Sequence, residues 1–241
     1  MYVSAVLTKL MDGGWLPFAI SLILAFIMFG WYNGRQKKLA YELSHKIDVD
    51  QLQSLLLEPE VRRVPGLCFF YTKLDEGMPP VLGHYVKNMK CLHSVTIFTT
   101  LRCLLVPKVS SQERVVVRKM GIEGVYGCAI HYGYADALDL EGDSLVSQVA
   151  ESLKQALSTK EFLSTDPVVI QKQVAQLDAA KQVGVVHVRG RTNFYMGKNS
   201  GWFDRLILTF YEVMHKCCRP ALPLVGIPLT QQVEVGMLYE A

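Results

Sequence analysis

Basic residues cluster where the sequence comes nearest to a phosphate-binding pattern. The segment "GKNSG" (197–201) has the Gly-Lys pair of a phosphate loop, but Thr192 stands where that motif needs its first glycine, and Asn199 stands where it needs Ser or Thr. What remains is a weak anion site from Arg189, Arg191 and Lys198 near an expected helix start. The plainer interpretation is a solvated edge strand, because charged side chains keep strand edges from pairing.

Acidic and sulfur-bearing residues give no stronger motif. The stretch "HYGYADALDLEGD" holds four carboxylates but lacks the spacing and terminal Glu of a calcium loop, so we expect a solvated loop before a helix. These carboxylates are Asp136, Asp139, Glu141 and Asp143. The six cysteines, at 68, 91, 103, 128, 217 and 218, have no C-x-x-C spacing, and we expect reduced, mostly buried thiols.

Histidines likewise lack the spacing of a metal site or of a catalytic motif. They stand at 45, 84, 93, 131, 187 and 215, with no H-E-x-x-H, and the chain has no G-x-S-x-G. We therefore assign no catalytic, cofactor-binding or metal-binding residue and expect no cofactor. The net charge of +3 is too small to favour nucleic acid as a partner.

One apolar segment dominates the amino-terminal part. Residues 13–34 carry no charge and, as a helix of about 1.5 Å rise per residue, match a hydrocarbon core of about 30 Å. A signal peptide would have a shorter apolar run and a basic start, and a buried core helix would have a polar face. Arg35, Lys37 and Lys38 follow the segment at once, which predicts a cytosolic carboxyl-terminal side.

The rest of the chain predicts an α/β (α+β) domain with a mixed sheet. The expected limits are a transmembrane segment over 1–34, a helical connector over 35–62, and the domain over 63–241 with a polar linker near 158–182. The expected order is β-α-β-β-β-α-β-α-β. Its strands cover 64–72, 94–107, 113–120, 125–134, 183–196 and 231–240, and its helices cover 79–88, 142–157 and 199–219.

Several blocks in order resemble the K⁺ uptake permease family (KUP/HAK/KT) of potassium transporters. They are "GGWLP" with the basic exit, "RVPGLCFFYTKLDEGMPPVLGHYVKNMKCLH", "VPKVSSQERVVVRKMG", "CAIHYGYAD" and "QVEVGMLYEA". His131 and Ala135 depart from basic residues usual in that family. The resemblance implies the last transmembrane helix and cytosolic domain of a transporter whose potassium sites lie on earlier helices.

This resemblance implies a potassium transport function in which the present chain regulates or dimerises, with lipid and K⁺ as partners and a homodimer in the plasma membrane. We carry over no ion-binding residue, and we expect that one helix with so few polar groups does not conduct K⁺ alone. The expectation is a fragment of a transporter or a truncated paralogue. One alternative is a membrane-anchored nucleotide- or anion-binding regulatory module around Arg189 and Arg191. The other is a membrane-tethered enzyme, which no sequence motif supports.

Overall fold

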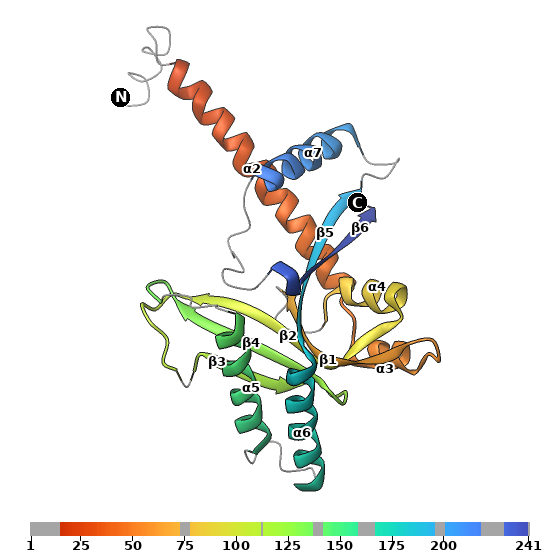
Figure 1. The fold of residues 1–241 in the computed structure, drawn as a ribbon. Coiled ribbons are helices and arrows are strands. Elements are labelled where there is room, and N and C mark those ends of the chain that lie inside the picture. Colours follow the sequence, from red (N-terminus) through yellow and green to blue (C-terminus); the bar gives the residue numbers. More distant parts are fainter. Residues whose placement is uncertain are drawn as a thin grey trace. The chain divides into compact units, whose positions relative to one another are not determined.

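The computed structural model describes residues 15–72, 78–111, 113–136, 142–158, 167–195, 201–217 and 229–240. It has two compact units (Figure 1). The first comprises residues 1–44, 194–220 and 240–241, and the second comprises residues 45–193 and 221–239.

The first unit is built on one long helix. Helix α2 (Trp15–Ser44) runs without interruption through the described part of the predicted span, from Trp15, and ten residues beyond it. Helix α7 (Trp202–Cys217) packs against it. The prediction of a helix over the apolar segment is therefore confirmed, and the connector begins as a continuation of the same helix.

The second unit holds a six-stranded mixed sheet with the order β3-β4-β2-β1-β5-β6. The strands are β1 (Arg62–Thr72), β2 (Cys91–Leu104), β3 (Val115–Lys119), β4 (Val125–Gly133), β5 (Val185–Tyr195) and β6 (Gln232–Glu240). Strands β4, β2, β1 and β5 are parallel, and β3 is antiparallel to β4. The predicted hairpin is confirmed, and both Gly121 and Gly124 in its turn have positive φ, which glycine adopts without steric penalty.

The helices of this unit cover both faces of the sheet. Helix α3 (Val49–Leu57) begins at a capping box in which the Asp48 carboxylate accepts from the Val49 N–H. Helix α4 (Pro80–Met89) joins β1 to β2. Helices α5 (Gly142–Ser158) and α6 (Pro167–Val183) follow β4 and precede β5 in the chain. A short 3₁₀ helix, η3 (Leu229–Gln231), precedes β6.

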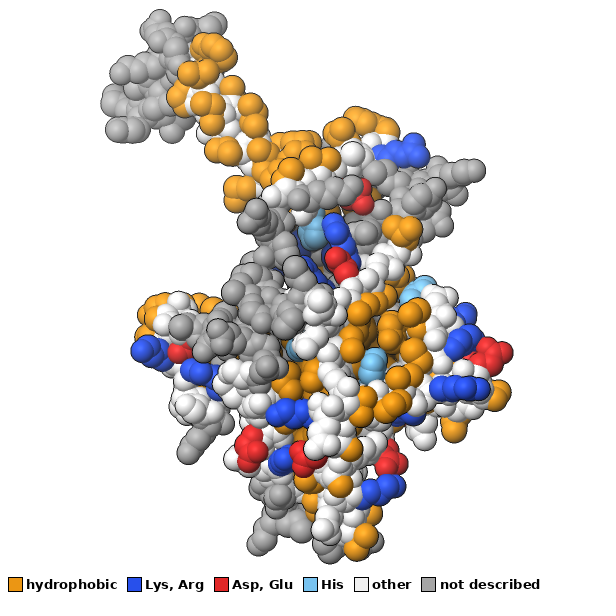
Figure 2. All heavy atoms as spheres, viewed as in Figure 1, with side chains coloured by type: hydrophobic (Ala, Val, Ile, Leu, Met, Phe, Trp, Pro, Cys, Tyr) orange, Lys and Arg blue, Asp and Glu red, His pale blue; other side chains and the backbone are white. Residues whose placement is uncertain are grey.

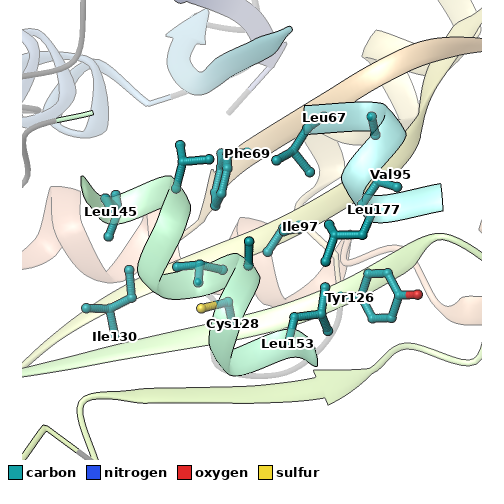
Figure 3. Close-up of a cluster of buried hydrophobic side chains, with 14 of the residues drawn as sticks. Leu67, Phe69, Val95, Ile97, Tyr126, Cys128, Ile130, Leu145, Leu153 and Leu177 are labelled. Atoms are coloured by element: carbon teal, nitrogen blue, oxygen red, sulfur yellow. The ribbon is translucent and has the colours of Figure 1, made fainter. Parts of the chain in front are cut away.

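Side chains alternate between two apolar layers, because successive residues of a strand point to opposite faces. Phe69 joins the larger cluster beneath α5 and α6, together with Ile97, Cys128 and Leu153 (Figure 3). Its neighbour Phe70 points the other way and meets Tyr85 of α4 edge-on. A mixed sheet with helices on it is thus what the sequence predicts, and the structure adds which face each helix covers.

Helix α6 corrects the predicted order of elements. The sequence predicts a polar linker near 158–182, whereas residues 167–183 form a full helix, so the order is β-α-β-β-β-α-α-β-α-β. The apolar stripe of α6 is narrow: Leu177 and Ala180 are buried, while Ile170 and Val174 are only partly covered. So short a stripe on an otherwise polar segment is a weak signal of periodicity, yet Leu177 and Ala180 are buried against the core of the assembled sheet.

Candidate functional site

Helix α2 carries the most conspicuous surface of the described chain. It is the one described helix long and apolar enough, by length and composition, to cross a membrane. Its large side chains from Trp15 to Phe29 are exposed except Ile27, which is half-buried, and only Gly30 and Gly34 are buried. Figure 2 shows the hydrophobic side chains along this stretch. Water does not favour so long an apolar surface, and a bilayer accepts it.

Two glycines let α7 approach α2 closely. A Cβ on Gly30 would lie 2.9 Å from the Phe210 ring, and one on Gly34 would overlap the ring of Tyr211. The spacing Gly-x-x-x-Gly puts both positions on one face of the helix, as in close contacts between membrane helices. Gly30 and Gly34 therefore form the surface of α2 against which α7 packs.

Aromatic rings complete this contact. Phe26 and Phe210 have centroids 5.7 Å apart, and Trp31 lies 5.3 Å from Tyr211. His215 stacks on Trp31 at 6.4 Å. A histidine that the sequence leaves without a role thus belongs to the contact between α2 and α7.

In the α/β unit, polar groups gather where the carboxyl end of β1 lies beside the first half of β5. The Tyr71 hydroxyl lies 3.0 Å from Nδ1 of His187, and the two rings stack 6.0 Å apart. The two strands pair in parallel, with Tyr71 opposite Arg189. Tyr71, His187 and Arg189 therefore lie on one face of the sheet.

Burial governs the charges of this group. It lowers the pKa of His187 to about 4 and raises the pKa of Tyr71, so both side chains are neutral at pH 7. One of the two donates the hydrogen bond, and the Nε2 atom of His187 has no partner among the described residues. The Thr99 hydroxyl, on β2 opposite Tyr71, is buried and equally unpaired within the described part of the chain. A ligand with both a donor and an acceptor would suit these groups.

The structure describes two of the three predicted basic residues, Arg189 and Arg191, which lie two positions apart on β5. Arg189 is half-buried beside Tyr71, whereas Arg191 forms an ion pair with Glu234 of β6 at 3.7 Å. Lys198 lies outside the described residues. The interpretation of this segment as an edge strand is wrong, because β6 pairs with β5 and makes it an interior strand. The sequence alone does not say that the closing strand is added on this side.

Asp136 has a structural role that the sequence does not predict. Its carboxylate accepts from the backbone N–H groups of Gly133 and Val109, at 2.8 and 3.0 Å, and lies 3.5 Å from Arg114. The side chain is only 7% exposed, so the expected solvated loop is wrong at this position. The blocks "VPKV" and "YGYAD" thus form one local structure. Of the other three carboxylates, Asp139 and Glu141 lie outside the described residues, and nothing is described of the Asp143 side chain.

The remaining candidates show no assembly for chemistry. No group of three or more His, Cys, Asp or Glu side chains able to hold a metal occurs within the described ranges. The described cysteines are free thiols: Cys68 and Cys128 are buried, Cys91 is half-buried, and Cys103 and Cys217 are exposed. Burial raises the pKa of Cys68 and of Cys128 to about 12. The prediction of reduced thiols fits, although fewer are buried than expected.

Sequence reasoning misses the pairing of Tyr71 with His187. The two residues are 116 positions apart, and only the parallel pairing of β1 with β5 brings them together. The available signal is that each stands within an apolar strand where a polar side chain has to find a partner.

Comparison with known proteins adds the family. The family model described as "K+ potassium transporter C-terminal domain" matches residues 65–240. "Probable potassium transporter 17" of Oryza sativa subsp. japonica is 53% identical over 99% of this chain and 34% of its own length. "Probable potassium transporter 4" of the same species is 51% identical over 100% of this chain and 33% of its own. "Potassium transporter 5" of Arabidopsis thaliana is 27% identical over 100% and 37%.

The chain spans about a third of the length of these curated relatives. No solved structure matches it. The match to the family model covers both apolar layers of the sheet. The blocks that resemble the family in sequence include β1, α4, β3, β4 and β6 and the start of α2. The chain belongs to the K⁺ uptake permease (KUP/HAK/KT) family of potassium transporters, and it corresponds to their carboxyl-terminal portion.

Proposed function

We propose that this chain acts as the carboxyl-terminal part of a potassium ion transmembrane transporter that takes up K⁺. In this proposal α2 crosses the bilayer, and the α/β unit lies in the cytosol and regulates transport or joins two copies. The observation that carries the proposal is the family match over residues 65–240, which follows an exposed apolar helix, Trp15–Ser44, in the chain.

The charges after the span support the orientation. Arg35, Lys37 and Lys38 lie on α2 just beyond its apolar part, and basic residues are retained on the cytosolic side of a membrane. The free thiols of the α/β unit fit a reducing compartment. The plasma membrane is the proposed location.

A chimera tests the proposal. Residues 1–241 replace the matching third of rice "Probable potassium transporter 17", and K⁺ uptake is measured in cells that lack their own uptake system. We expect the chimera to take up K⁺, and the same relative without its carboxyl-terminal third to do so weakly or not at all. A chimera that reaches the membrane in normal amount but stays inactive, beside an active parent, would refute the proposal.

The two roles proposed for the α/β unit are separable. If it joins two copies, the purified chain in detergent has twice the protein mass of a monomer by light scattering. If it regulates without joining copies, the mass is that of a monomer, while changes in this unit alter uptake by the chimera. A monomer whose α/β unit tolerates such changes with unaltered uptake would exclude both roles.

A second candidate function is binding of an anion or nucleotide beside Tyr71, His187 and Arg189, near the carboxyl end of β1. Arg189, Tyr71 and the unpaired His187 Nε2 favour it. Calorimetry on the full chain in detergent, with ATP and with inorganic phosphate, tests it. Binding that weakens about tenfold in Arg189→Gln but not in Arg191→Gln, whose arginine pairs with Glu234, would support it. Absence of binding heat and of any thermal shift would remove it.

A further inference from the structure

Helix α7 has more apolar surface than its contact with α2 uses. Ile207, Leu208 and Tyr211 are buried. On the opposite side, Trp202, Leu206 and Val213 are 79%, 49% and 54% exposed. With about 3.6 residues per turn, positions 202, 206 and 213 fall on one stripe that lies across the helix from Tyr211. We call these three residues the outer stripe.

Away from the contact with α2, the polar side chains that the structure describes on α7 share one flank. Arg205, Thr209 and Glu212 lie three or four residues apart and so share a side of the helix next to the outer stripe. The Thr209 hydroxyl donates to the carbonyl oxygen of Arg205 at 2.8 Å, so it is already satisfied within the helix. The described side chains thus place an apolar stripe beside a polar flank, an arrangement found in helices that lie in a membrane surface.

The position of α7 along α2 defines the level at which the outer stripe lies. Phe210 meets Phe26 and Gly30, and Tyr211 meets Trp31 and Gly34. These α2 residues form the carboxyl-terminal end of the apolar stretch, directly before Arg35. A helix held there lies where the hydrocarbon core gives way to the headgroups, and tryptophan favours that level.

We propose that α7 is an interfacial helix whose outer stripe is buried in the lipid of the leaflet at the basic end of α2. Lipid is the occupant because the outer stripe and the apolar stretch of α2 belong to one compact unit, and both expose large apolar side chains that a bilayer covers and water does not favour. The polar flank, with Arg205 and Glu212, then faces the water. The inference rests on the proposed function only in that α2 has to cross the bilayer.

Tryptophan fluorescence tests this placement in the full chain reconstituted into phosphatidylcholine vesicles. The chain has three tryptophans, so Trp15→Phe with Trp31→Phe leaves Trp202 as the only one. The matched control adds Trp202→Phe and Arg205→Trp, which moves the fluorophore to the polar flank one turn away. A third variant, Met28→Trp with Trp202→Phe in the same background, reports on α2, because Met28 is 71% exposed within the apolar stretch.

Lipid brominated on its acyl chains should quench Trp202 at least about twofold more than the tryptophan of the Arg205→Trp control, and aqueous iodide should show the reverse. Equal quenching at both positions, or protection of Trp202 from both quenchers by protein, would overturn the inference. The Met28→Trp variant separates the two proposals. If its tryptophan is quenched by the lipid and Trp202 is not, only the placement of α7 fails. If neither is quenched, α2 does not cross the membrane.

Discussion

The hydroxyl of Tyr71 and the Nδ1 atom of His187 lie 3.0 Å apart on two parallel strands at the centre of the sheet. His187 is 1% exposed and stacks on Phe69, with ring centroids 5.3 Å apart. The pair thus joins β1 to β5 by a side-chain hydrogen bond in addition to the backbone ladder.

Removing the hydroxyl should destabilise the α/β unit. Tyr71→Phe keeps the ring stack but leaves Nδ1 of His187 buried without its partner, which costs roughly 1–3 kcal/mol in the free energy of unfolding. Urea unfolding of the full chain in detergent, followed by far-UV circular dichroism, measures this. Tyr132→Phe provides the control, since Tyr132 is also partly buried on a parallel strand. Equal midpoints for the two variants would show that the hydrogen bond adds nothing.

The decrease in the free energy of unfolding at acid pH should depend on His187. Burial lowers its folded pKa to about 4, below the ordinary 6.5, so the unfolded chain binds the proton more readily. Stability should therefore be highest above pH about 6.5 and should fall as the pH drops toward 4. His187→Phe removes this group and should make the profile flatter in that range. His93, whose pKa burial also lowers, accounts for part of the remaining slope. An unchanged slope in the variant would contradict this assignment.

Replacing Asp136 should loosen the loop between β2 and β3. Oδ2 of Asp136 accepts both backbone N–H groups, and Oδ1 faces Arg114. Asp136→Asn keeps one oxygen for the two donors but removes the charge that strengthens both bonds and that faces Arg114, so we expect a Tm lower by several degrees at pH 7. Hydrogen bonds from Gly133 and Val109 hold the pKa of Asp136 below its usual value. The difference in Tm between the native chain and Asp136→Asn should accordingly be complete above pH about 4. It should disappear as the pH falls through the lower folded pKa of Asp136. A Tm gap between variant and native chain that persists at the lowest pH would speak against the charge as its cause.

A methyl group added to the face of α2 that contacts α7 should displace α7. Gly34→Ala puts a methyl group into the ring of Tyr211, which separates the helices and moves Trp31 away from Tyr211. In a chain with Trp31 as its single tryptophan, its emission should shift relative to the parent. Ala25→Leu, on an exposed part of α2, is the control and should leave the spectrum unchanged. The contact would be disproved by identical spectra in the two variants.

Helix α6 should behave as part of the core. Leu177→Ala removes a side chain that is 1% exposed beneath the sheet and should cost about 2–5 kcal/mol in the free energy of unfolding. Gln171→Ala, on the exposed side of the same helix, should change it by less than about 0.5 kcal/mol. If both variants unfold at the same urea concentration, residues 167–183 are the linker that their composition indicates.

The contrast between α2 and α6 explains how far the sequence predicts this fold. Twenty-two uncharged residues are a strong local signal of an apolar helix, and the Gly121–Gly124 turn defines the hairpin locally. The stripe of Leu177 and Ala180 is meaningful only against the sheet, which is assembled from strands far apart in the chain. Local patterns therefore predict element types well and miss an element whose burial depends on the assembled sheet.

The same distinction between local and long-range patterns applies to the candidate site residues. Family resemblance assigns the transport class, while the positions of Tyr71, His187 and Arg189 on one face follow from parallel pairing that has no local signature. The partner of Arg191 is likewise Glu234, on a strand that closes the sheet from the end of the chain. Spacing along the sequence carries no information about such a pair.

The unbroken course of α2 has a mechanical consequence. Thirty residues of helix make a rod of about 45 Å, of which a bilayer core takes about 30 Å. If α2 crosses a bilayer as proposed, its last ten residues, through Ser44, extend beyond the hydrocarbon core as a continuous helix. A tilt of the part in the bilayer by about 10° would then move the end of the helix by about 2–3 Å.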